Sequence, residues 1–517
     1  MIGTVQFEHT EAGFTGMASW PRQYHIEAGG EWVAGSVPAI RNVLLSQGWI
    51  VRAAAAEARR GEVTLLDSFD WRLAGQGSVL LRNESGVLSC IPVCSDADPV
   101  DPERLESRCR EGVAPEPVEP VRLPEDCVDR LAPRVVLRYG SSSWEERLYT
   151  LSDENQKTIA LLQSVRFQRT PGKTSRRRSL GLVRLVPLRG FTRFVPVVPG
   201  RAVDAGTEIA TFIAEPAGRR PLDYETSLHL PLHRNHSIAE VHKIVTEHLL
   251  AVCAVNIDGI VQRIDPEYLH DFRVSIRRLR SYLKAVPHRA DPLVEGDLRS
   301  FWDASGRPRD LDVFLLRQRH YTRGAPIAIR EEVHQVFAQI ARWRDRAYDD
   351  LSDRFTGDDF PRLRSGLAGI LPDDATESAT DLADRLHRKA DRAFRRSVDR
   401  LIRAYREKGE ELSDDRIHDA RIKAKKLRYV TEIFSPVLSA SQTGKTRSIR
   451  RMRKLQNLLG AYNDLVVEEK LFLRILDERP GELERLRAGV AYMLAQVERE
   501  KATARHRVME TLGREVQ

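Results

Sequence analysis

Two stretches of this sequence repeat one pattern and decide its fold. Residues 269–280 read LHDFRVSIRRLR, and residues 417–428, which begin 148 positions later, read IHDARIKAKKLR. Each stretch carries a His-Asp pair, followed by cations three, seven, eight and ten residues after the histidine. Neither stretch contains proline or glycine, and Leu, Arg, Lys and Ala favour the helix. Both stretches are therefore predicted to be helical.

Helical spacing places most of these cations on one face. At about 100° per residue, positions 0, 3, 7 and 10 fall on one side of a helix. We call these sets the first stripe (His270, Arg273, Arg277 and Arg280) and the second stripe (His418, Arg421, Lys425 and Arg428). Arg278 and Lys426 lie beside the stripes, where pairing with acids is an equal alternative. A recurring stripe of fixed cations suits a polyanion.

The distribution of charge also points to the C-terminal half. The 517 residues include 82 Lys and Arg against 74 Asp and Glu, which gives a net charge of +8. Residues 1–227 hold 28 of these cations and 29 of these acids, and the remainder holds 54 and 45. The whole excess lies in the half that carries the stripes, which predicts an anionic partner there.

Composition argues against several other classes of protein. Five cysteines in so long a chain form no disulfide framework, and Cys90 and Cys94 lack a second pair at zinc-site spacing. No uncharged apolar run approaches the roughly 18–20 residues that cross a bilayer, and the N-terminus lacks a signal-peptide pattern. We therefore expect a cytoplasmic protein with no membrane association, no cofactor and no metal.

The apolar pattern changes along the chain. Residues 1–220 contain short apolar runs separated by turn residues, which predicts a β-rich domain. Within it we expect a helix over residues 38–60 and further strands at 193–198 and 208–213. Residues 221–232 are the predicted linker. From residue 233 to 517 the spacing is helical, which predicts an all-α domain with half-repeats at about 233–375 and 380–517.

A second pair of motifs supports the duplication. Gly306 and Asp310 follow the first stripe, and Gly460 and Asp464 follow the second, in both cases 154 positions apart. Each glycine is expected to start a helix. The shared order predicts two helical halves related by a pseudo-twofold axis, with both stripes facing one groove.

These motifs together resemble a CHAD domain. The resemblance rests on the two stripes, on RDLD at 309–312 and on LQNLLG at 455–460. It implies two four-helix bundles around a basic cleft, inorganic polyphosphate as the ligand, and association with polyphosphate granules. It also implies ligand contacts from both stripes, to which we add Arg278, Lys426, Arg451 and Lys454. Nearby acids are expected to orient the cations or cap helices: Asp271, Asp310, Asp312, Asp419 and Asp464.

A stretch in the N-terminal half resembles the CYTH, or triphosphate tunnel, family. Residues 67–82 read DSFDWRLAGQGSVLLR, in which Asp67, Leu73, Gly77, Leu80 and Arg82 fit that pattern. However, the family's Glu-x-Glu-x-Lys metal signature does not occur near the start of the sequence, and Glu84 replaces the pattern's second arginine. Triphosphate hydrolysis needs carboxylates around a divalent cation. We therefore expect a degenerate CYTH-like barrel and no enzymatic activity.

Two alternatives from other functional classes stay open. A metal-dependent phosphohydrolase is suggested by the two His-Asp pairs and by His242 and His248, but the many cations near each pair would repel a metal ion. A single-stranded nucleic-acid binder would also use basic stripes, although no aromatic residues interleave them. Nucleic acid is thus the less favoured partner. The sequence does not indicate an oligomeric state.

Overall fold

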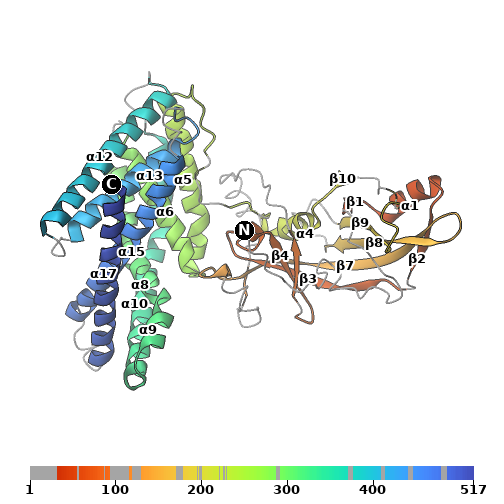
Figure 1. Ribbon diagram of the computed structural model, residues 1–517, viewed down its shortest axis with the longest axis horizontal. Helices are drawn as coiled ribbons and strands as arrows, with labels where there is room; N and C mark the ends of the chain where they lie inside the picture. Colours follow the sequence, from red (N-terminus) through yellow and green to blue (C-terminus); the bar gives the residue numbers. More distant parts are fainter. Residues whose placement is uncertain are drawn as a thin grey trace. The chain divides into compact units, whose positions relative to one another are not determined.

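The structure is a computed structural model of the 517-residue chain. It describes residues 32–516 with gaps at 55–56, 87, 93–115, 119–129, 170–178, 195, 197–200, 221, 225–227, 229, 287–291, 371–376, 409–413, 440–445 and 479–485. The chain divides into two compact units, Met1–Glu225 and Thr226–Gln517. Figure 1 shows the first unit as a sheet with short helices and the second as a set of long helices.

The N-terminal unit is built on one antiparallel sheet, which confirms the β-rich prediction. The hydrogen-bonded order is β10 (Arg201–Ala202), β1 (Val33–Ala34), β9 (Ser179–Pro187), β8 (Thr158–Gln168), β7 (Leu137–Ser152), β3 (Arg59–Asp67), β4 (Ser78–Asn83) and β5 (Leu88–Pro92). Two shorter strands, β2 (Ile50–Ala53) and β6 (Glu116–Pro117), also pair with β7. Among the described strands no pairing joins β10 to β5, so the expected CYTH-like barrel is not confirmed.

Three local predictions in this unit are wrong. Residues 38–60 do not form one helix, because α1 (Val37–Ser46) ends just before Gly48, whose φ of 87° belongs to the left-handed region. Residues 208–213 lie in a helix, α4 (Ala205–Ala214), whose Asp204 side chain accepts from the Gly206 and Thr207 amides. In the expected strand 193–198, Arg193 and Phe194 lie in a turn, while residues 195, 197 and 198 lie outside the described residues.

A buried cluster ties the stretch with the CYTH-like pattern to the end of this unit. Asp67 accepts hydrogen bonds from the backbone amides of Ser68, Leu73 and Ala74, which closes the turn after β3. Arg219, which is 1% exposed, pairs with Asp223 at 2.8 Å and donates to the Phe69 carbonyl at 2.6 Å. The Asp223 carboxylate also accepts from the Trp71 indole at 2.8 Å. Asp67 thus has a structural role here.

Removing Arg219 is expected to destabilise the N-terminal unit. In Arg219→Met the Asp223 carboxylate stays buried without its cation, which costs about 3–5 kcal/mol of unfolding free energy. Urea denaturation of the full-length protein measures this loss. The control is Arg60→Met, because Arg60 is exposed and pairs with Glu145 at the surface, so its loss should cost less than about 1 kcal/mol. Equal effects of the two variants would contradict the prediction.

The C-terminal unit is helical, as predicted. Its described α-helices are α5 (Ile238–Val261), α6 (Pro266–Leu283), α7 (Pro292–Ala304), α8 (Gly306–Leu316), α9 (Gln318–Gly324), α10 (Arg330–Thr356), α11 (Asp359–Ala368), α12 (Ala379–Lys408), α13 (Asp414–Phe434), α15 (Thr446–Glu478) and α17 (Arg487–Val516). The first stripe lies on α6 and the second on α13. Asp265 caps α6 by accepting from the Glu267 amide at 2.9 Å, with Pro266 at the first helical position.

Apolar faces fix how α6 and α13 sit in this unit. Leu269, Phe272, Ile276 and Leu279 are fully buried on α6, away from the stripe. Ile417, Ala420, Ala424 and Leu427 play the same part on α13. Because one face of each helix is buried in the apolar core, the face that carries the cations points away from that core.

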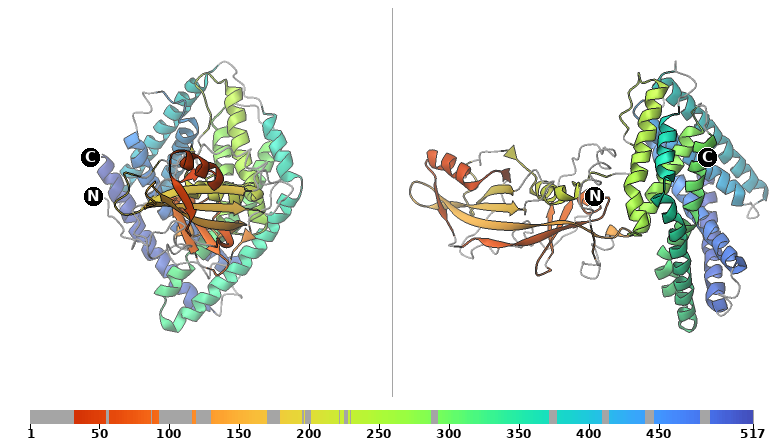
Figure 2. Two further views of the ribbon diagram at one scale, coloured as in Figure 1. Left: turned by 90° about the vertical axis from the view of Figure 1, so that its right-hand side faces the viewer. Right: turned by 180° about the vertical axis from the view of Figure 1, so that it is seen from behind.

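Two long helices connect two core clusters. One cluster lies between α8, α9 and α10 and includes Phe472 of α15 and Val497 of α17. The other lies between α12 and α13 and includes Leu459 of α15 and Val508 of α17. Figure 2 shows these long helices in two further views. The pseudo-twofold relation between two four-helix bundles stays a prediction.

The two glycine motifs differ in structure. Gly306 begins α8 as predicted, but Gly460 lies inside the continuous helix α15, so the prediction of a helix start is wrong there. A side chain at Gly460 would meet nothing within 4 Å of its Cβ. A helix continues through glycine at a cost of about 1 kcal/mol, which neighbouring contacts can offset.

One described helix, α5, is long and apolar enough to meet the criteria for a membrane span. Its most apolar 18-residue window has a mean hydropathy of 1.6, and 56% of that window is buried within the protein. Val241, Val245 and Leu249 of α5 are fully buried. Core helices pass the same test, so this feature is weak evidence for a membrane.

Candidate functional site

The two stripes meet in one pocket of about 670 Å³. His270, Arg273 and Arg277 of the first stripe line it, together with all four members of the second stripe. The other lining residues come from α7, α8 and α15: Trp302, Arg309, Asp310, Val313, Phe314, Asn457, Gly460, Ala461, Asn463, Asp464, Val467, Glu468 and Leu471. Stretches 148 residues apart in the sequence thus contribute to one lining.

Trp302 organises the first stripe. The guanidinium carbons of Arg273, Arg277 and Arg280 lie 4.2, 5.2 and 5.1 Å from the centre of its indole ring. Attraction between a cation and an aromatic face offsets part of the repulsion among the three arginines. Sequence reasoning missed Trp302, because it comes from another helix and no motif marks it.

Arg273 forms the buried end of the first stripe. It is 8% exposed, and its Nη1 donates to the Trp302 carbonyl at 2.9 Å and to the Ser305 hydroxyl at 2.7 Å. Burial, followed by repulsion from Arg277, lowers its pKa to about 10. Its Nε has no hydrogen-bond partner among the described residues.

The second stripe is held by α15. Nδ1 of His418 lies 2.6 Å from the amide oxygen of Asn463. Since that oxygen can only accept, Nδ1 carries a proton and Nε2 is the ring nitrogen left for a ligand. Nη2 of Arg421 lies 3.7 Å from a carboxylate oxygen of Asp464. The companion motif on α15 therefore orients the histidine and an arginine of the second stripe.

Lys425 is the cation most affected by this crowding. Burial lowers its pKa to about 7, and repulsion from Arg277, Arg421 and Arg428 adds to the shift, while Asp464 opposes it. The amine of Lys425 therefore loses its proton at a much lower pH than an ordinary lysine does. An anion in the pocket would favour the charged form.

Several predicted contacts lie elsewhere. Arg278 is buried against Glu432, with its Nη2 3.4 Å from the carboxylate, and it does not line the pocket, so its contact with a ligand stays a prediction. Lys426 is not among the lining residues either, and its neighbouring charges are Lys284, Lys389 and Lys423. Arg280 contacts Trp302 just outside the lining. Arg451 and Lys454 lie in α15, but their side chains fall outside the described part of the protein.

The acids near the stripes have separate roles. Asp310 and Asp464 line the pocket. Asp312 is buried and accepts from the Tyr348 hydroxyl at 2.6 Å, while its burial raises its pKa to about 6. Asp419 lies 3.5 Å from Arg400 and 3.4 Å from Lys423, and it does not line the pocket. Asp271 is buried on α6.

The residues suggested for a metal site do not join the stripes. His242 is buried on α5, with its ring 5.7 Å from that of Tyr282. Neither His242 nor His248 lines the pocket. Within the described ranges, no group of three or more His, Cys, Asp or Glu residues is placed to hold a metal ion.

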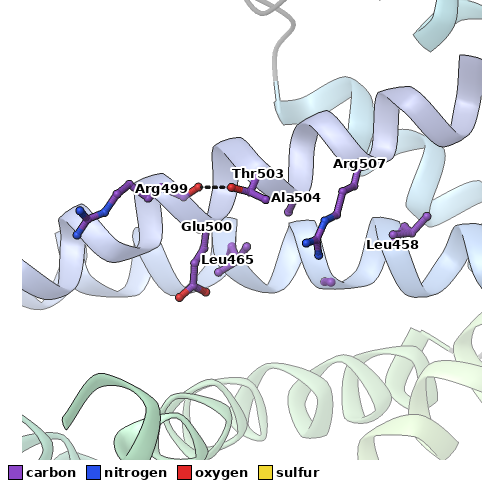
Figure 3. Close-up of a pocket in the computed structure, with 8 residues that line it drawn as sticks. Leu458, Leu465, Arg499, Glu500, Thr503, Ala504 and Arg507 are labelled. Carbon is purple, nitrogen blue, oxygen red and sulfur yellow. Dashed lines mark hydrogen bonds between the residues drawn. The ribbon is translucent and has the colours of Figure 1, made fainter. Parts of the chain in front are cut away.

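A second pocket, of about 400 Å³, lies between α15 and α17 and is shown in Figure 3. Leu458 and Leu465 of α15 face Thr503 and Ala504 of α17 across it. Its one acid, Glu500, is engaged by Arg317 at 2.5 Å and by His320 at 2.7 Å. This pocket is mainly apolar, and none of the predicted ligand contacts lies in it.

Comparison with known proteins identifies the fold of this unit. The CHAD domain family model matches residues 244–473. These residues form a CHAD domain.

Two solved structures are similar: the crystal structure of the CHAD domain from the plant Ricinus communis, and PptA from Streptomyces chartreusis. The first is 22% identical, covers 56% of this chain and 96% of its own, and has a TM-score of 0.46. The second is 16% identical, covers 53% and 99%, and has a TM-score of 0.39. No curated protein matches the sequence.

The CHAD domain should gain stability when Lys425 is removed. The pKa of Lys425 is about 7 in the folded protein, against an ordinary value of 10.5. Below pH 7 the folded state bears the full penalty of the buried charge, and between pH 7 and 10.5 the unfolded state binds more protons, so stability rises with pH. We expect Lys425→Met to have a higher urea midpoint than the wild type at pH 6. That advantage should shrink by pH 9.5.

The matched control is Lys243→Met, because the Lys243 side chain is 72% exposed. Its urea midpoint should differ little from that of the wild type at either pH. An advantage of Lys425→Met that is the same at both pH values would contradict the prediction, since it would come from apolar burial rather than from charge.

Proposed function

We propose that the CHAD domain binds inorganic polyphosphate, without covalent chemistry, in the pocket where the two stripes meet. The observation that carries this proposal is the convergence of both stripes on one lining. Polyphosphate bears about one negative charge per phosphate and has no bases, so a binder needs many cations and needs no stacking surface. Association with polyphosphate granules in the cytoplasm would follow from such binding.

The charge balance of the pocket supports a polyanionic ligand. Five arginines and one lysine line it, against the acids Asp310, Asp464 and Glu468. Glu468 is engaged by Arg317 at 2.5 Å and accepts from the Tyr321 hydroxyl at 2.8 Å. Arginine forks bind phosphate oxygens in pairs, and Lys425 adds a compact charge. The lining thus keeps an excess of positive charge.

Binding rather than hydrolysis suits these groups. Metal-assisted phosphate hydrolysis needs carboxylates that converge on a divalent cation. Here Asp464 lies beside Arg421, and Glu468 is paired with Arg317. We therefore propose that the domain holds the polymer and does not cleave it.

The position of Trp302 favours polyphosphate over single-stranded nucleic acid. Binders of single strands stack bases on open aromatic faces. In this pocket three arginine side chains lie over the Trp302 ring, at 4.2 to 5.2 Å from its centre. A base would have to displace them to stack there.

Removal of one cation from each stripe should abolish tight binding. We expect full-length Arg277→Ala/Lys425→Ala to bind polyphosphate chains of defined length at least about 100-fold more weakly than the wild type, because two phosphate contacts and their counterion release are lost. Calorimetric titrations at two salt concentrations measure the affinity, and the salt dependence should become shallower in the double variant.

The control for this experiment is Lys243→Ala/Arg395→Ala, which removes the same charge from two exposed surface pairs. It should bind like the wild type to within a few-fold. A wild type that binds no polyphosphate, or a double variant that binds as well as the control, would refute the proposal. Stronger binding of single-stranded nucleic acid at matched phosphate concentration would favour the alternative ligand.

Binding should take up protons because of Lys425. The pKa of the free amine is about 7, and a bound anion raises it. Affinity should therefore stay level below pH 7 and fall as the pH rises above it, until the pKa of the bound state is reached. Titration at pH 7.5 in two buffers of different ionisation enthalpy measures the number of protons taken up.

In Lys425→Met this uptake should decrease. Lys425→Arg should also lose the lysine contribution while it keeps much of the affinity, because arginine stays charged. Proton uptake of the same size in the wild type and in both variants would show that Lys425 is not its source.

A further inference from the structure

The contact between α6 and α13 is asymmetric in charge. On one side, Arg278 of α6 forms an ion pair with Glu432 of α13. The 148-residue repeat relates position 278 to 426 and position 284 to 432. The repeat-related contact is therefore between Lys426 of α13 and Lys284 of α6, and these two lysines repel each other. The Arg278–Glu432 contact thus joins opposite charges, whereas the Lys426–Lys284 contact brings two positive charges together.

Two more lysines enlarge this second contact. Lys389 of α12 and Lys423 of α13 also repel Lys426, and burial together with these charges lowers the pKa of Lys426. Among the described residues, the ion pair of this group joins Lys423 to Asp419 at 3.4 Å, and Asp419 also lies 3.5 Å from Arg400. We call Lys284, Lys389, Lys423 and Lys426 the lysine cluster. One shared carboxylate cannot neutralise four ammonium groups.

The lysine cluster continues the first stripe beyond the pocket. Lys284 follows Arg280 by four residues, and its φ of −65° and ψ of −17° keep it in helical geometry. Residues four apart on a helix lie about 5–6 Å from each other on the same face. Cations therefore follow one another from Arg277 inside the pocket, through Arg280 beside Trp302, to Lys284 and then to Lys426.

We propose that the lysine cluster is a second binding site for polyanionic phosphate chains, which engages the part of a long polymer that extends out of the pocket past Arg280. This inference rests on the proposed function of the pocket and adds a separate set of contacts to it. A bound anion would relieve the repulsion among the lysines. The ligand class is a phosphate polymer too long for the pocket alone.

The charge swap Lys284→Glu tests the cluster with two opposite effects. The new carboxylate can pair with Lys426 as Glu432 pairs with Arg278, so thermal stability should rise. Affinity for polyphosphate of about 100 phosphates should fall about five- to tenfold, and its salt dependence should become shallower. Affinity for tripolyphosphate, which is short enough to stay in the pocket, should change less than about twofold.

Two further variants separate the effect of the lysine cluster from the effect of net charge and from the effect of adding an acid. Lys243→Glu changes the net charge equally at an exposed position on α5, and it should leave the affinity for long chains nearly unchanged. Lys389→Gln/Lys426→Gln removes two cluster charges without a new acid, and it should weaken long-chain binding selectively.

The outcomes separate this inference from the proposed function. If the wild type binds neither tripolyphosphate nor long chains, the pocket proposal fails, and this inference fails with it. If the wild type binds both, and the cluster variants bind long chains as tightly as Lys243→Glu does, only the lysine cluster is refuted. An equal loss for short and long chains would also refute it, since the cluster would then act through the pocket.

Discussion

The repulsion among cations gathered in one place is the constraint on which the CHAD domain depends. Arg277, Arg421 and Arg428 all act on Lys425, and burial strengthens their effect because the local dielectric constant is low. The unfavourable free energy of this repulsion must be offset by favourable contacts elsewhere in the fold. Here the compensation comes from buried apolar faces on α6 and α13, from the Trp302 ring, and from Asp464 beside Arg421. Stability and ligand affinity therefore oppose each other at Lys425.

Much of the helical unit could be predicted because its signals are local. The capping residue Asp265, the proline after it and the apolar positions of α6 are readable within one stretch, and the structure agrees with all three. The stripes could be found for the same reason, since helical spacing alone puts their members on one face. That both stripes line one pocket was predicted from their repetition.

Where a contact of the stripes was missed, the residue's partner comes from a distant segment. Nothing near Arg278 in the sequence indicates that Glu432 lies opposite, and nothing near the first stripe indicates Trp302. In the N-terminal unit, the run from Glu208 to Ile213 has apolar residues that suit a strand or a helix, and the Asp204 cap decides for the helix. Gly460 was expected to begin a helix because it matches Gly306, whereas α15 continues through it.

The lengths of α15 and α17 also affect how the domain unfolds. Each of these helices places buried side chains in both core clusters, such as Phe472 and Leu459 of α15. Loss of one cluster would fray a helix that the other cluster needs for its own packing. The two clusters are thus coupled through continuous backbone, and we expect the helical unit to unfold as one cooperative unit rather than as two independent halves.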